Sequence, residues 1–96
     1  MTTNEVSEST TATAEEIGTA LQSFLVGRLK TDVAQDLDLF KTGLVSSMFA
    51  MELVVHLEES YDIAIIGSEL KLDNFRTVQA MTALVLRLRG GAGVDG

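Results

Sequence analysis

Apolar residues recur at helical spacing in three segments of the chain, and the first segment begins after residue 12. Its apolar positions are Ile17, Leu21, Phe24, Leu25 and Leu29. Thr13 and Glu16 stand in the pattern of a capping box, in which a hydroxyl and a carboxylate each satisfy a free backbone N–H. The pattern therefore predicts a first helix over about residues 14–30.

The helical spacing lapses between residues 31 and 45, where Asp32, Asp36 and Asp38 alternate with single apolar residues and Gly43 marks a turn. We expect a long, partly packed loop here. Asp36 and Asp38 have the spacing of the first ligands of a calcium loop, but the later oxygen ligands, the glycine and the closing glutamate of an EF-hand are not at the required positions. The sequence therefore predicts no metal site.

The second helix should run from Ser46 or Ser47 to Ser60, with one of the two serines as its N-cap. At about 100° per residue, one side of this helix gathers large apolar residues and should face the core. These residues are Ala50, Leu53, Val54, Leu57 and Tyr61.

A second apolar stripe, formed by Met48, Met51 and Val55, lies almost diametrically opposite the core side. Glutamates border it, with Glu52 and Glu59 on one flank and Glu58 on the other. A helix that is apolar on both sides is fully buried only between two covering layers, which a bundle of three substantial helices hardly provides. We therefore expect the stripe to be exposed and to dock partners, since methionine repacks readily against different surfaces. The simpler alternative is that these residues are also core.

The last apolar segment follows Thr77, which should cap a helix with Val78, Met81, Leu84, Val85 and Leu88 on its buried side. Residues 67–72 are compatible with one or two further helical turns. We predict an all-α four-helix bundle, with three main helices and one short helix, over residues 13–89. Residues 1–12 lack the apolar content to offset ordering and should be a disordered tail, and residues 90–96 a flexible tail.

The composition narrows the function classes. Among 96 residues, 14 are acidic and 7 basic, so the net charge of −7 disfavours nucleic acid and anionic membranes and favours basic protein partners. The absence of cysteine excludes disulfides, thiolate metal sites and a cysteine nucleophile. With no 18-residue apolar run and no signal-peptide pattern at the start, we expect a cytoplasmic protein. We also expect it to be a monomer.

The adjacent residues Ser46 and Ser47 are the candidate chemical groups. His56, the only histidine, follows Ser47 by nine residues, so it would lie about 13 Å along the helix and on its opposite side. A serine–histidine dyad, and with it a small hydrolase, is thereby disfavoured. A serine at a helix start is nevertheless well placed to hold a phosphate diester, because free N–H groups and the positive end of the dipole face it. Alternatively, either serine is only an N-cap.

Residues 36–65, DLDLFKTGLVSSMFAMELVVHLEESYDIAI, resemble the centre of an acyl or peptidyl carrier protein. In that family a loop leads into Asp-Ser-Leu, and the helix that follows ends in Glu-Glu-x-Phe-x-Ile. The segment MELVVHLEESYDI, residues 51–63, aligns with that pattern and sets Ser47 on the family's serine and Met48 on its leucine. The resemblance extends over about residues 14–88. It departs from the family at Ser46, which replaces the aspartate, and at the bulky Phe49.

The resemblance implies a carrier that is a covalent substrate of its partner enzymes and not a catalyst. Ser47 would bear 4'-phosphopantetheine from coenzyme A, with Ser46 as the less favoured position, and the arm would hold an acyl group as a thioester. The implied partners are a phosphopantetheinyl transferase and acyl-loading or acyl-modifying enzymes or polyketide synthase modules. The implied contact residues are Met48, Met51, Glu52, Val55, Glu58 and Glu59.

Two subtypes resemble this sequence. The form DLFKTGLVSSMFAMELV is similar to freestanding carriers of polyketide extender units such as alkoxymalonyl groups, in which Ser-Ser replaces Asp-Ser, and we favour this subtype. The DLF-x-x-GL pattern is also similar to D-alanyl carriers, and a peptidyl carrier is a further alternative. A rival of another class is an unmodified helical adaptor that binds proteins through the Met48, Met51 and Val55 stripe.

Overall fold

The computed structural model describes residues 13–95, with side chains up to Arg89, and over this range the chain is all-α with no strand. Its helices are α2 (Ala14–Leu29), α3 (Ser47–Tyr61), α4 (Leu72–Phe75) and α5 (Val78–Asp95), with a 3-10 turn, η1 (Gly67–Glu69). The predicted class, three main helices and one short helix, is confirmed. The predicted tail at residues 1–12 lies outside the described residues. Among the described helices, none combines the length and the hydrophobicity that a membrane-spanning segment requires.

Side chains cap the helices as the sequence predicts. At the start of α2, the Glu16 N–H donates to the Thr13 hydroxyl (3.2 Å) and the Thr13 N–H donates to the Glu16 carboxylate (2.9 Å). At the start of α5, the Ala80 N–H donates to the Thr77 hydroxyl (2.9 Å). The α5 helix continues to Asp95, past the end predicted near Arg89. The assignment of residues 90–96 to a tail outside the domain stays a prediction.

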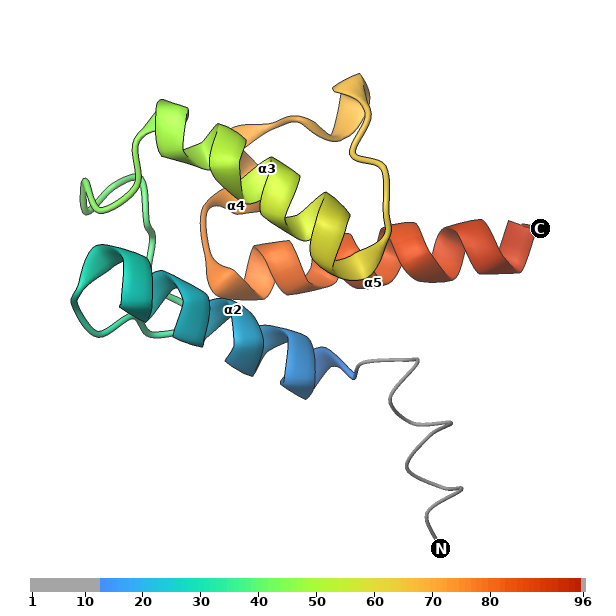
Figure 1. Cartoon of the computed structure of the whole chain (residues 1–96). Coiled ribbons are helices and arrows are strands. Elements are labelled where there is room, and N and C mark those ends of the chain that lie inside the picture. Colours follow the sequence, from blue (N-terminus) through green and yellow to red (C-terminus); the bar gives the residue numbers. More distant parts are fainter. Residues whose placement is uncertain (1–12, 96) are drawn as a thin grey trace, which may run out of the picture.

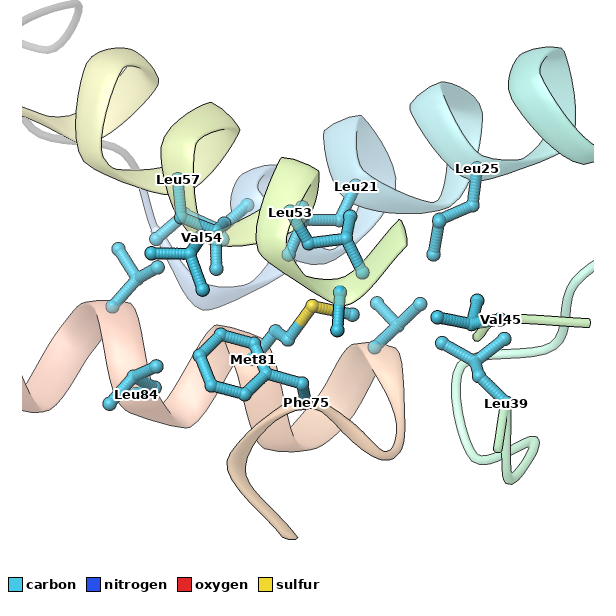
Figure 2. Packing of buried hydrophobic residues seen from close by; sticks show 14 of the residues in the cluster. Leu21, Leu25, Leu39, Val45, Leu53, Val54, Leu57, Phe75, Met81 and Leu84 are labelled. Carbon is cyan, nitrogen blue, oxygen red and sulfur yellow. The ribbon is translucent and has the colours of Figure 1, made fainter. Parts of the chain in front are cut away.

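The three long helices surround one apolar core. Figure 1 shows α2 and α5 on one side of the bundle, with α3 lying over them and α4 behind α3. Side chains of α2, α3 and α5 meet between the helices together with Phe75 of α4 (Figure 2). On α3, the predicted core side is confirmed: Ala50, Leu53, Val54 and Leu57 are buried and Tyr61 is half-buried.

The loop of residues 31–45 closes one end of the core. Its apolar residues Leu39 and Val45 point into the cluster (Figure 2), and the Val45 N–H donates to the Leu39 carbonyl (3.0 Å). The Leu39 N–H in turn donates to the Arg76 carbonyl between α4 and α5 (2.8 Å). Gly43 has the positive φ of 82° that the predicted turn needs. This partly packed loop therefore fixes where α3 begins.

A second connection, residues 62–77, leads from the end of α3 back to the loop of residues 31–45, where α5 begins. The sequence predicts one or two helical turns at residues 67–72, and the structure forms η1 there and the separate helix α4 after it. Phe75 is almost fully buried and fastens α4 to the core. The Asn74 side chain donates to the Glu69 carbonyl (2.7 Å), which joins α4 to η1.

Candidate functional site

The two adjacent serines at the start of α3 have different environments. Ser46 is the N-cap, with extended backbone angles, and its hydroxyl accepts a hydrogen bond from the Phe49 N–H (3.1 Å). Ser47 is the first residue of the helix and is exposed, and its hydroxyl makes no hydrogen bond within the part of the chain that the structure describes. The capping function therefore belongs to Ser46, which leaves the Ser47 hydroxyl open to a reagent from solvent.

The electrostatics at Ser47 suit an anion. The first turn of α3 contains no acidic residue, so no carboxylate there competes for the free backbone N–H groups. Those N–H groups and the aligned peptide dipoles give the helix start a partial positive charge. A phosphate attached to Ser47 would lie where this charge is strongest.

The apolar stripe next to Ser47 is exposed. Met48, Met51 and Val55 have 80, 58 and 49% of their surface accessible, although all three are apolar and lie on one helix. The predicted exposure of this side of α3 is confirmed. Its role in docking partners stays a prediction, taken up below.

The three glutamates that border the stripe differ in their contacts. Glu52 forms an ion pair with Arg28 of α2, with 2.6 Å between the Arg28 Nη2 and Glu52 Oε1 atoms. Glu58 is half-buried, and its carboxylate accepts a hydrogen bond from the Ile65 N–H (2.8 Å), so it ties α3 to the following loop. Glu59 is exposed and takes part in no ion pair within residues 13–95.

Aromatic and cationic side chains line the seam between α2 and α3. The Phe24 and His56 rings stack in parallel, with centroids 3.9 Å apart and 9° between the planes. The Arg28 guanidinium lies 4.9 Å from the Phe49 ring centroid and 5.6 Å from that of Phe24. Burial lowers the pKa of His56, whereas Glu59 acts to raise it and Arg28 to lower it. His56 is thus partly exposed, as predicted, and used in packing.

A shallow groove runs along this seam beside the stripe. Its lining comes from both helices: Phe24 and Arg28 of α2, and Met51, Glu52, Val55, His56 and Glu59 of α3. The sequence predicts four of the α3 residues of this surface, Met51, Glu52, Val55 and Glu59, but neither His56 nor the α2 residues. Helical spacing places Phe24 in the apolar stripe of the first helix, and no sequence pattern indicates that Arg28 reaches across to α3.

Asp38 organises the loop that leads to Ser47. Its carboxylate accepts hydrogen bonds from the Lys41 N–H (2.8 Å) and from the Arg76 guanidinium (3.2 Å). The bond from Lys41 is the main cause of the lowered pKa of Asp38, and Arg76 acts in the same direction. No group of three possible ligands for a metal ion is present in the part of the chain that is described.

No family model matches the sequence. The chain is 38% identical over 50 residues to the D-alanyl carrier protein of Lactococcus lactis subsp. cremoris strain MG1363, a match of 52% of this chain and 63% of that protein. It is 39% identical over 54 residues to the D-alanyl carrier proteins of Streptococcus sanguinis strain SK36 and Streptococcus thermophilus strain LMD-9. This second match takes in 56% of the chain and 68% of each streptococcal protein. The chain thus spans somewhat less than two thirds of the length of its lactococcal relative and slightly more than two thirds of the streptococcal ones. These matches, together with the all-α bundle and the open serine at a helix start, show that the chain belongs to the carrier-protein family.

Proposed function

We propose that this protein is a carrier whose Ser47 bears a 4'-phosphopantetheine arm. The observation that carries the proposal is the division between the two serines: Ser46 caps α3, and the exposed Ser47 hydroxyl is free to be modified. The names of the relatives support a carrier role. When bound, the arm would supply a terminal thiol that holds cargo as a thioester. A chain without cysteine has no thiol of its own.

The residues around Ser47 fit the phosphate of this arm. The N–H groups at the start of α3 would stabilise its negative charge, and the first turn offers no acid to repel it. Ser46 stands where the family's motif has aspartate, and serine and aspartate are comparably good N-caps. The replacement therefore retains the cap that shapes the helix start, while it removes a negative charge beside the attachment site.

The exposed stripe and its acidic flank are the proposed docking surface for enzymes that work on the arm. Met48, Met51 and Val55 would give an apolar contact, and Glu52 and Glu59 would attract basic groups. The expected partners are a phosphopantetheinyl transferase and the enzymes that load or modify the cargo. Glu58 fits this role less well than predicted, since its carboxylate is engaged with the Ile65 N–H.

The comparisons support an aminoacyl cargo such as D-alanine better than a polyketide extender unit. The relatives named above are D-alanyl carrier proteins. The extender-unit subtype is supported only by the sequence pattern around the adjacent Ser46 and Ser47. A competition experiment distinguishes the two. The phosphopantetheinylated protein would be offered D-alanine and ATP with the loading enzyme of a streptococcal relative, or an alkoxymalonyl donor with its transferase, and intact mass spectra would identify the thioester formed.

The attachment is tested by incubating the protein with coenzyme A and a broad-specificity phosphopantetheinyl transferase. We expect one phosphopantetheine adduct in the intact mass spectrum of the wild type, mapped to Ser47 in the peptide spectrum. Ser47→Ala should abolish the adduct. Ser46→Ala is the matched control and should still be modified, because only the cap is lost. The opposite result for the two variants would move the attachment to Ser46.

The exposed stripe also favours a second candidate, an unmodified adaptor that binds proteins through Met48, Met51 and Val55. The same experiment separates the two functions. If the wild type stays bare while a known carrier is modified under the same conditions, the carrier proposal fails and the adaptor remains.

A further inference from the structure

Glu52 and Glu59 line the same groove, but only Glu52 is engaged by a cation within the described part of the chain. We propose that Arg28 is a specificity-determining residue of the docking surface: it occupies Glu52, so that Glu59 is the acidic group available to a basic partner. The inference rests on the proposed function, because it concerns the partners that would act at Ser47. It adds a residue of α2 to a surface assigned above to α3.

The position of Arg28 favours a persistent pair. Its guanidinium lies over the rings of Phe49 and Phe24, and cations are attracted to aromatic faces. Arg28 is also in the last turn of α2, where the negative end of the helix dipole favours a positive charge. These contacts restrict the guanidinium to the neighbourhood of the Glu52 carboxylate. An exposed ion pair usually loses much of its Coulomb attraction to the entropy of holding two long side chains, and this restriction reduces that loss.

The consequence concerns the charge that a partner meets. Arg28 and Glu52 compensate each other at 2.6 Å, and His56 tends to be neutral because burial lowers its pKa, so Glu59 supplies the uncompensated charge of the groove. A basic group that approaches Glu52 must first displace Arg28. A fitting partner is therefore a protein surface with one basic side chain directed at Glu59 and an apolar side chain placed over Met51 and Val55.

The fold provides a matched control for this pair. Arg87 of α5 pairs with Glu69 of η1 at the same Nη2–Oε1 distance of 2.6 Å, and the two arginine side chains are similarly exposed, at 46% for Arg28 and 51% for Arg87. Neither Arg87 nor Glu69 lines the groove. Arg87→Gln therefore changes the net charge as Arg28→Gln does and also breaks one ion pair, but leaves the docking surface intact.

The test is a double-mutant cycle on the complete chain. The kcat/KM of a phosphopantetheinyl transferase with coenzyme A would be measured at low and high salt for the wild type, Arg28→Gln, Glu52→Gln and the double variant. If Arg28 occupies Glu52, Glu52→Gln should lower kcat/KM by less than about 2-fold in the wild type but by about 5-fold in the Arg28→Gln background, where a freed carboxylate can pair with the enzyme. Arg28→Gln should also steepen the salt dependence, which Arg87→Gln should not.

Each outcome decides the inference. An equal effect of Glu52→Gln in both backgrounds would mean that the charges act independently, and it would overturn the inference while leaving the carrier function intact. The inference is likewise overturned if Arg28→Gln behaves like Arg87→Gln at both salt concentrations. Thermal unfolding of every variant shows whether a change in kcat/KM comes from a loss of folded protein. A wild type that is never modified, beside a control carrier that is, would overturn the proposed function itself and the inference with it.

Discussion

The two sides of α3 contain similar residues in opposite environments. Leu53 and Leu57 are fully buried against α2 and α5, whereas Met51 and Val55, on the same helix, have about half of their surface exposed. The core side is covered because α2 and α5 pack against it. Among the described residues, no further element covers the open side. The difference separates two kinds of apolar residue: those whose loss should unfold the bundle, and those whose loss should affect only what the bundle binds.

The largest effect should come from the core side. Leu53→Ala removes buried methyl groups and leaves a cavity among side chains from three helices, and such changes cost about 2–5 kcal/mol of unfolding free energy. Val55→Ala on the open side should cost less than about 0.5 kcal/mol. Urea unfolding followed by circular dichroism measures both. Equal losses in the two variants would contradict the distinction between the two sides.

A change on the open side should act on binding instead. Met51→Glu places a carboxylate where the proposed partner makes apolar contact, and we expect about a 10-fold or greater loss of transferase kcat/KM because that charge must be desolvated on docking. The unfolding free energy should stay close to that of the wild type. Met51→Leu is the control and should retain most of the activity. A loss of thermal stability that parallels the loss of activity would show that Met51 is part of the core.

The sequence predicts both sides of α3 because helical periodicity is a local property. A spacing of three or four residues assigns Leu53, Leu57, Met51 and Val55 to their sides without knowledge of the neighbouring helices. The position of α4 is harder to predict, since four residues show no period and its place depends on the burial of Phe75. A feature can therefore be predicted from the sequence to the extent that it is local.

The contacts of the candidate site are not local in this sense. Arg28 and Glu52 are 24 residues apart, and they meet only because α2 and α3 pack with these sides together. Glu58 reaches Ile65 through the fold of a loop with no regular pattern. The choice between Ser46 and Ser47 as N-cap is ambiguous for another reason: both side chains can cap a helix, and only the backbone path of the preceding loop decides between them.

A smaller effect should follow from the loss of the cap. Ser46→Ala leaves the Phe49 N–H without its partner, and it should lower the unfolding free energy by about 1 kcal/mol. Ser47→Ala should change the unfolding free energy by less than about 0.5 kcal/mol, because its exposed hydroxyl makes no hydrogen bond to the described residues. Thermal denaturation of the two variants measures the difference. If Ser47→Ala were the more destabilising change, the division of roles between the serines would be wrong.

The smallest effect is the pH dependence of stability that comes from His56, which stacks on Phe24 in the seam between α2 and α3. Burial against Phe24 lowers the pKa of His56 below its usual 6.5, so the folded protein binds fewer protons than the unfolded chain as the pH falls through that value. Stability should therefore be fully present above about pH 6.5 and decrease slightly as the pH falls through the lower pKa of the folded state. Asp38, whose pKa is also lowered, acts in the same direction but in the more acidic range below about pH 4.

Two variants separate these contributions. His56→Gln should remove the loss of stability near neutral pH and retain the loss in the acidic range, and Asp38→Asn should do the reverse. Urea midpoints measured from pH 3 to 8 resolve the two steps, and a neutral step that persists in His56→Gln would assign it to another group.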